Sequence, residues 1–239
     1  MSKILSRSMP LLAKSIAIAS IAGICSQALP SYAGFNPGGT VGKPGNRRGL
    51  ATRGGGCKAS SNPTLTTLVP KNNVGLTASA TPTFYWFIPN NTYQYVNFSL
   101  YKVDAEDNPT DLVYASTSRI SGEGGLASVS LPEQGTTQTL EAGKSYRWMV
   151  RLLCSGNDRR GLSATGWITY SPPSPQLSNQ LAAQPENKAD VYGEAGYWYD
   201  AVKELALQKQ ANPNSPGVNL AWKALMESEF VQLNQLAAL

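Results

Sequence analysis

The sequence has 239 residues, of which 20 are basic and 15 are acidic, and it contains no histidine. A chain without histidine lacks the side chain that most often acts as a general base or a metal ligand. The chain is long enough for one well-packed core and a smaller additional element.

Residues 1–33 have the composition of a cleaved secretory signal. The only charges of this segment are positive, at Lys3, Arg7 and Lys14. Residues 15–25 are apolar, and the small residues Ser31 and Ala33 indicate a cleavage site before Gly34. A helix needs about 20 apolar residues to cross a bilayer, so this run is too short for a retained anchor. We therefore expect an extracytoplasmic mature protein, in the periplasm or cell envelope or released, with no integral membrane segment.

Loss of the leader nearly balances the charge of the chain. Of the 20 basic residues the leader contains three, which leaves 17 basic against 15 acidic residues. The whole-chain pI of about 9.1 therefore overstates the basicity of the mature protein. We expect no nucleic-acid partner, because such proteins usually show a strong basic patch or stripe.

Two of the three cysteines, Cys57 and Cys154, remain after cleavage. Disulfides form and persist in oxidising compartments, so the sequence favours a bridge between them, with two free thiols as the alternative. The bridge would close a loop of roughly 100 residues and add at most about 4–5 kcal/mol in the chain-entropy treatment. Two cysteines without histidine do not complete a tetrahedral zinc site, and we expect no metal or cofactor.

Residues 34–63 are predicted to form a flexible arm. The segment is rich in glycine, has no helical or strand periodicity, and contains Lys43, Arg47, Arg48 and Arg53. Such a composition is typical of linkers. The arm is either a solvated linker or a contact for anionic polymers of the envelope.

Residues 64–171 alternate with a period of two, which indicates strands with one buried face. The clearest inward face is formed by Tyr146, Trp148, Val150, Leu152 and Cys154. Seven or so short strands separated by turn residues, with no helices between them, predict a mainly β domain. We expect an antiparallel sandwich of the immunoglobulin or fibronectin type III kind.

Two motifs agree with such a sandwich. The spacing Leu140-x-x-Gly143-x-x-Tyr146 is that of a tyrosine corner, in which the tyrosine hydroxyl bonds to the backbone upstream. Residues 82–86 (PTFYW) predict an early core strand with a buried tryptophan. Most aromatic side chains fit the core, whereas Tyr93, Tyr95 and Tyr101 fall out of phase with the inward face and are the candidates for exposure.

Residues 172–187 are rich in proline and are predicted to form a stiff linker, and residues 188–239 then show helical periodicity. The first helix includes Val191, Ala195, Trp198 and Leu205 and ends at residues 212–214. Ser215 is the expected N-cap of a second helix, with Pro216 at its first position. Residues 230–239 are expected to add a short third segment.

This C-terminal α-helical hairpin is similar to a single tetratricopeptide-type unit, which is too small to bury its own apolar face. We expect it to pack on the sandwich with Trp198 and Trp222 buried. Exposed tryptophans would instead indicate a partner or a second copy, so both are candidate interaction residues.

The sequence contains no recognisable catalytic motif. It has no Gly-x-Ser-x-Gly motif, no cysteine–histidine pair and no suggestive pair of carboxylates. Asp158, Arg159 and Arg160 form the densest charge cluster of the β region, in the loop that follows Cys154. This cluster either binds an anionic group or is a solvated loop tip.

Several motifs together resemble the DUF928 family. They are Leu65-Thr66-Thr67-Leu68-Val69-Pro70, Gly75-Leu76-Thr77, Pro82-Thr83-Phe84, Ser128-Val129-Ser130-Leu131-Pro132, Gly143-Lys144-x-Tyr146-x-Trp148, Cys154-x-x-x-Asp158-Arg159, Gly166-Trp167-Ile168 and Tyr192-x-Glu194-Ala195-Gly196-x-Trp198-Tyr199-Asp200-Ala201, together with Cys57. Arg160 stands where the family pattern often has serine. The resemblance implies an exported cyanobacterial protein and supplies no activity or cofactor.

These observations lead to three hypotheses of function. The first is a non-enzymatic, exported interaction or structural module whose partner is another envelope protein. The second is a module that binds glycan or peptidoglycan through exposed aromatic side chains and residues 158–160. The third is a hydrolase that works without histidine, which would need two carboxylates about 5–10 Å apart in a concave pocket.

Overall fold

The computed structural model describes residues 34–39, 41–49, 56–132, 138–158 and 160–239, so the predicted leader lies outside the described residues. The strands are β1 (Thr66–Thr67), β2 (Val74–Thr77), β3 (Thr83–Ile88), β4 (Tyr95–Val103), β5 (Pro109–Arg119), β6 (Gly125–Ser130), β7 (Ser145–Leu153) and β8 (Leu162–Tyr170). The helices are α1 (Pro175–Ala183), α2 (Lys188–Glu194), α3 (Trp198–Ala211) and α4 (Pro216–Glu227), with short 3₁₀ turns at Pro185–Asn187 and Asn234–Leu236.

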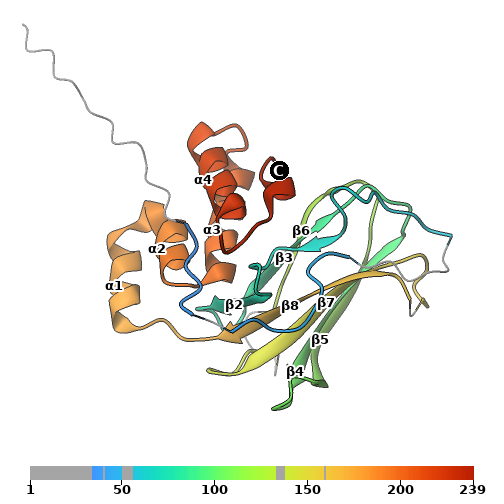
Figure 1. The fold of residues 1–239 in the computed structure, drawn as a ribbon, viewed down its shortest axis with the longest axis horizontal. Coiled ribbons are helices and arrows are strands. Elements are labelled where there is room, and N and C mark those ends of the chain that lie inside the picture. The colour runs from blue at the N-terminus through green and yellow to red at the C-terminus, as the bar shows by residue number, and fades with distance from the viewer. Residues whose placement is uncertain (1–33, 40, 50–55, 133–137, 159) are drawn as a thin grey trace, which may run out of the picture. The chain divides into compact units, whose positions relative to one another are not determined.

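The strands form two sheets, so the protein has a mainly β fold with C-terminal helices (Figure 1). The smaller sheet has the order β1-β3-β6 and the larger one the order β2-β8-β7-β4-β5. All pairs are antiparallel except β2 with β8, which run parallel. The prediction of a purely antiparallel arrangement is therefore wrong at this edge, because β2 comes from an early part of the chain and lies beside the last strand.

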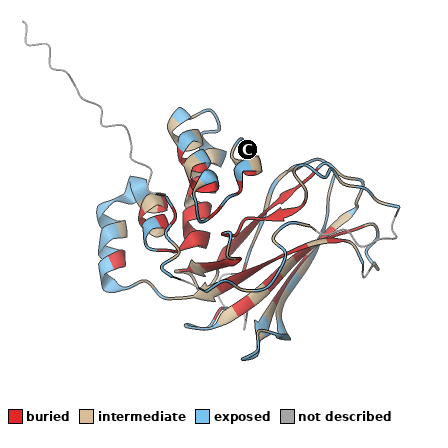
Figure 2. Ribbon diagram, viewed as in Figure 1, coloured by how far each residue is buried: buried red, intermediate tan, exposed pale blue. Residues whose placement is uncertain are grey.

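The core lies between the facing sides of the two sheets. Phe84 of β3 contacts Phe98 of β4 and Trp148 of β7, with ring centroids 4.9 and 5.3 Å apart. The predicted alternation along β7 is confirmed, since Tyr146, Trp148, Val150 and Leu152 are all buried. Figure 2 shows these buried positions along the strands, whereas most of β5 is exposed.

The predicted tyrosine-corner contact is present at the start of β7. The backbone N–H of Glu141 donates to the Tyr146 hydroxyl over 2.9 Å. Gly143 lies between them with φ +76°, a conformation that glycine adopts without steric cost. The early core strand is also confirmed, because all six residues of β3 are buried.

The segment expected to be a stiff linker contains a helix. Helix α1 begins at Pro175, and the side chain of Ser174 caps it by accepting from the N–H of Leu177 over 3.2 Å. Proline fits the first turn of a helix, where its missing N–H is not needed. The prolines at this point therefore start a helix, and Leu177 anchors it in a small apolar cluster with Val191 and Tyr197.

The helical tail differs in one respect from the predicted hairpin. The expected first helix is divided into α2 and α3 by residues 195–197, where Gly196 has φ +84°. The predicted end of α3 and start of α4 are correct, and Ser215 caps α4 by accepting from the N–H of Val218. The apolar spacing of the sequence continues across this break, because Val191 of α2 and Trp198 and Leu205 of α3 are all buried.

The helical tail packs on the β region of its own chain. Helix α3 lies against β2 and β3, and Trp198 and Trp222 have no exposed surface. A single cluster of buried side chains includes both tryptophans and the core residues of the sheets. Among the described residues no helix is long and apolar enough to cross a membrane.

The first part of the predicted arm is not free. Phe35 is buried with its ring 5.1 Å from that of Trp198. The Arg47 guanidinium donates to the carbonyls of Val69, Val231 and Gln232, and so joins the arm to the C-terminal segment. The glycine-rich composition concealed this role, because the acceptors are backbone carbonyls that no side-chain pattern reveals.

Candidate functional site

The most constrained polar groups lie where helix α3 meets the two sheets, a region here called the junction. The indole N–H of Trp148 donates to the Tyr199 hydroxyl over 2.6 Å, and that hydroxyl donates to the carbonyl of Trp167 over 2.9 Å. The indole N–H of Trp198 donates to the carbonyl of Leu68 over 2.7 Å. Burial raises the pKa of Tyr199 far above its usual value, so the hydroxyl stays neutral.

Asp200 is the buried carboxylate of the junction, with 8% of its surface exposed. It accepts a hydrogen bond from the N–H of Ala78 over 2.8 Å and one from the Thr77 hydroxyl over 3.5 Å. Burial raises its pKa to about 6, and the two hydrogen bonds oppose this shift. The carboxylate therefore ties α3 to the end of β2.

Two glycines allow the aromatic rings of the junction to approach the strands. A Cβ on Gly75 would lie 2.9 Å from side-chain atoms of both Trp198 and Tyr199. A Cβ on Gly166 would lie 2.7 Å from the indole of Trp148. Any larger residue at these positions would push the rings away from the sheet.

The junction is suited to holding the fold together. Tyr199 and Asp200 are buried and already bonded to protein groups. In the part of the chain that the structure describes, no three metal-ligating side chains gather into a possible metal site.

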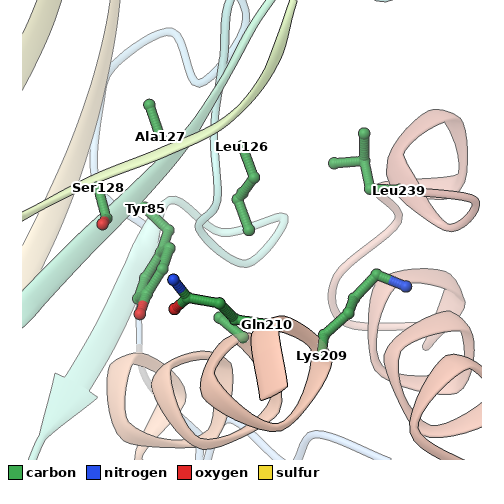
Figure 3. Close-up of a pocket in the computed structure, with 8 residues that line it drawn as sticks. Tyr85, Leu126, Ala127, Ser128, Lys209, Gln210 and Leu239 are labelled. Atoms are coloured by element: carbon green, nitrogen blue, oxygen red, sulfur yellow. The ribbon is translucent and has the colours of Figure 1, made fainter. Parts of the chain in front are cut away.

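One groove lies between β6, α3 and the C-terminal residue Leu239, with a cavity volume of about 440 Å³ (Figure 3). Tyr85 reaches toward Gln210 on one side, and Leu126 faces Leu239 and Lys209 across the groove. Burial, with a contribution from Glu204, raises the pKa of Tyr85. Among the described residues no aspartate or glutamate lines this groove.

Two other hollows lie at opposite ends of the sheets. One of about 490 Å³ adjoins the Cys57–Cys154 disulfide and is lined by Lys58 and Tyr93. The other, of about 230 Å³, adjoins the tyrosine corner, where Lys102 and Glu141 form an ion pair of 2.7 Å. Glu141 is the one acidic side chain that lines any of these three spaces, as far as the structure describes them.

The structure places the predicted disulfide and the described residues of the predicted charge cluster, Asp158 and Arg160, in the same region. The bridge between Cys57 and Cys154 is present, with Cα atoms 5.9 Å apart. Asp158 closes a turn by accepting from the N–H of Ser155, Arg160 is exposed, and Arg159 lies outside the described residues.

Trp198 and Trp222 are wholly buried, so their use as surface interaction residues is not supported. The indole N–H of Trp222 donates to the carbonyl of Leu236 over 2.9 Å, and that of Trp198 bonds to the β region. Both side chains serve the packing of the tail in its own chain, which is the alternative that the sequence favoured.

Sequence reasoning missed a polar surface on the larger sheet, here called the outer face. It consists of the side chains of β4, β5 and β7 that point away from the core. Of the three tyrosines expected to be exposed, Tyr95 and Tyr101 lie on it, and all three are half-buried. Cations accompany them, because β7 places Arg147 beside Tyr101 and Arg151 beside Asn97, and Arg119 of β5 lies opposite Tyr95.

The chain matches a known protein family over most of its length. The sequence model of the Domain of Unknown Function (DUF928) family matches residues 48–238. The chain belongs to the DUF928 family. A search of curated proteins found no match to the chain. The DUF928 match covers both sheets and the four described helices.

Several of the motifs that carry the DUF928 resemblance meet at the junction. Gly75 and Thr77 come from one motif, Trp148 and Trp167 from two others, and Tyr199 with Asp200 from the helical one. In the fold they are joined by the hydrogen bonds and close contacts described above. These motifs therefore describe how helix α3 docks on the sheets.

Proposed function

We propose that this protein is an exported, non-enzymatic interaction module built on an immunoglobulin-like sandwich. The observation that carries the proposal is the closed junction, where the family motifs and the buried titratable side chains serve packing. The chain uses these residues to build a rigid scaffold, which leaves the surface of the sheets for contact with a partner.

The strand orders support the immunoglobulin-like assignment. If β1, β3 and β6 are strands A, B and E, the second sheet has the order A′-G-F-C-C′. In this scheme β7 is strand F, and Tyr146 stands near its start as the tyrosine corner requires. Trp148, fully buried on the same strand, packs against Phe84 of strand B.

The composition of residues 1–33 and the disulfide support export. A bridge between Cys57 and Cys154 persists in an oxidising compartment and is rare in the cytosol. Binding, in this proposal, takes place in the periplasm, in the cell envelope or outside the cell.

A carboxylate-dependent hydrolase has less support. Such an enzyme needs two carboxylates facing each other across a cleft. Glu141, the carboxylate of the hollow beside the tyrosine corner, is paired with Lys102, and this pairing lowers the pKa of Glu141. No second carboxylate lines that hollow in the described part of the chain.

The compartment is tested by expressing the full chain in its native host and analysing the mature product by mass spectrometry. We expect a chain that begins at Gly34, found outside the cytoplasm, with Cys57 and Cys154 oxidised. An intact precursor in the cytosol with both thiols reduced would contradict the proposal.

The absence of catalysis is tested by incubating residues 34–239 with envelope polysaccharide and peptidoglycan and analysing the products by size. We expect binding of an envelope component without shortening of any polymer. Cleavage products that increase with time, and that a Glu141→Gln variant does not form, would favour the hydrolase.

A glycan-binding function is the second candidate, and the outer face of the larger sheet favours it. This face combines half-buried tyrosines with amide, hydroxyl and guanidinium donors. Aromatic faces and polar donors together are what a sugar ring needs for stacking and for hydrogen bonding.

A further inference from the structure

We propose that the outer face of the larger sheet binds an acidic polysaccharide; this inference rests on the proposed role as an interaction module. The face is defined by the alternation of the strands. Phe98 and Trp148 point into the core, so their neighbours on β4 and β7 point outward.

Three arginines give the outer face its charge. Arg147 and Arg151 are on β7, and Arg119 is exposed on β5. None of the three forms an ion pair with a carboxylate of the described chain, and the buried Nε of Arg147 has no hydrogen-bond partner there. The nearby cation Lys43 is by contrast paired with Asp107. The arginine charge is therefore available to an anionic ligand.

The arginines are held in place by their neighbours. The Arg119 guanidinium lies 5.5 Å from the ring centre of Tyr95, and that of Arg147 lies 5.9 Å from the ring centre of Trp167. The Arg151 guanidinium contacts the sulfur of Met149 over 3.1 Å. Side chains that are already ordered lose less conformational entropy when they bind.

Between the cations lie groups that suit sugar hydroxyls. The Asn97 amide donates to the Thr117 hydroxyl over 2.9 Å, and its carbonyl accepts from Ser99 over 3.0 Å. Such groups accept and donate hydrogen bonds at a half-exposed surface. Tyr101, half-buried beside Arg147, adds an aromatic surface.

The geometry matches an extended polymer with repeated negative charge. Arg147 and Arg151 are four residues apart on one strand, which separates their Cα atoms by roughly 13 Å. Protein interfaces usually have buried aromatic or aliphatic anchors at the centre. On the described strands β4, β5 and β7 the one exposed large apolar side chain is Leu112, opposite Tyr101 on the edge strand, so the outer face has no apolar centre. A carboxylated polysaccharide fits this combination of charge and polarity better than a protein surface.

The test measures retention of residues 34–239 on immobilised polymers at low and physiological salt. Polygalacturonate is the acidic polysaccharide, dextran the neutral one, and polyglutamate a polyanion without sugar rings. We expect the protein to bind polygalacturonate at least about 10-fold more tightly than either of the others, with affinity that falls as salt rises. Equal binding to polyglutamate would overturn the assignment to a polysaccharide, and no binding to polygalacturonate would overturn the proposal.

The site is tested with R147Q/R151Q and with the control K71Q/K223Q, which removes the same charge from exposed lysines elsewhere. We expect at least a 10-fold loss of affinity for polygalacturonate in the first variant and less than a 2-fold change in the control. Equal losses of affinity in the two variants would show that net charge alone is responsible, and would rule out the outer face as the binding site. Because Arg147 packs near Trp167, R119Q/R151Q serves as a second variant if R147Q/R151Q unfolds more readily.

The two proposals fail in different ways. If the protein binds no acidic polysaccharide but is exported and retains another envelope component, the inference fails and the proposed function stands. If polygalacturonate is shortened on incubation, the non-enzymatic function fails.

Discussion

Asp200 illustrates how one buried ionisable residue joins two elements of this fold. Its carboxylate accepts from the N–H of Ala78 and from Thr77 at the end of β2, while its backbone belongs to α3. Burial disfavours the charged form, which is why the pKa rises to about 6 although hydrogen bonds oppose the shift. The residue therefore couples the docking of the helix to pH.

We predict that the free energy of unfolding increases as the pH falls from 7 to 5 and that Asp200→Asn reduces this dependence. The folded state holds the proton of Asp200 more tightly than the unfolded chain, whose aspartates titrate near 3.9. Stability contributed by protonation is thus present near pH 5 and lost as the pH rises through about 6. Urea unfolding at pH 5, 6 and 7 measures the effect.

The control for this measurement is Asp190→Asn. Burial also raises the pKa of Asp190, but this side chain is half-exposed, so its substitution should leave most of the pH dependence in place. The chain has no histidine to titrate in the same range. If the free energy of unfolding of Asp200→Asn depended on pH as strongly as that of the wild type, the role assigned to this carboxylate would be contradicted.

At the scale of elements, the packing of α3 on β2 depends on the absence of a side chain at Gly75. Trp198 and Tyr199 occupy the space above this glycine and then bond to Leu68, Trp148 and Trp167. A small residue on a strand would ordinarily weaken the strand, because it contributes no packing of its own. Here it lets a helix approach the sheet closely.

We predict that Gly75→Ala lowers the free energy of unfolding by about 1–3 kcal/mol, the usual cost of overpacking a tight core. The added methyl group would lie 2.9 Å from two aromatic side chains. Gly56→Ala is the matched control, since a Cβ there meets no atom within 4 Å and should change stability by no more than about 0.5 kcal/mol. Equal effects of the two substitutions in urea unfolding would refute the close-contact explanation.

At the scale of the whole molecule, the two sheets, helices α3 and α4 and the arm share one core. Buried residues of β3, β7, α3 and α4 belong to one apolar cluster, and Phe35 of the arm adds to it. Arg47 links the arm, the end of β1 and the C-terminal segment, and burial lowers its pKa to about 10, still high enough to keep the charge at neutral pH. The division into a sandwich and a separate helical hairpin is thus not a division of the core.

We therefore predict a single cooperative unfolding transition for residues 34–239. Circular dichroism at 222 nm follows the helices, and the near-ultraviolet signal follows the aromatic core of the sheets. The two curves should coincide in urea, as expected for a two-state unit. Two separate transitions would show that the tail folds independently of the sheets.

The sequence by itself determined those features that depend on local periodicity and local chemistry. Alternation identified the inward face of β7, the spacing around Tyr146 indicated the tyrosine corner, and Ser215 with Pro216 marked the start of α4. Each of these signals lies within about ten residues of chain, where backbone geometry dictates the pattern.

Only the tertiary structure decided which distant groups meet. The parallel pairing of β2 with β8, the buried use of Asp200, the anchoring of Arg47 and the outer face with Arg147 and Arg151 all join residues far apart in the chain. A hydrogen bond to a backbone carbonyl cannot be predicted from the residue type of its acceptor, because every residue has such a carbonyl. The sequence of a segment determines its local periodicity, whereas its contacts with other segments depend on the packing of the whole chain.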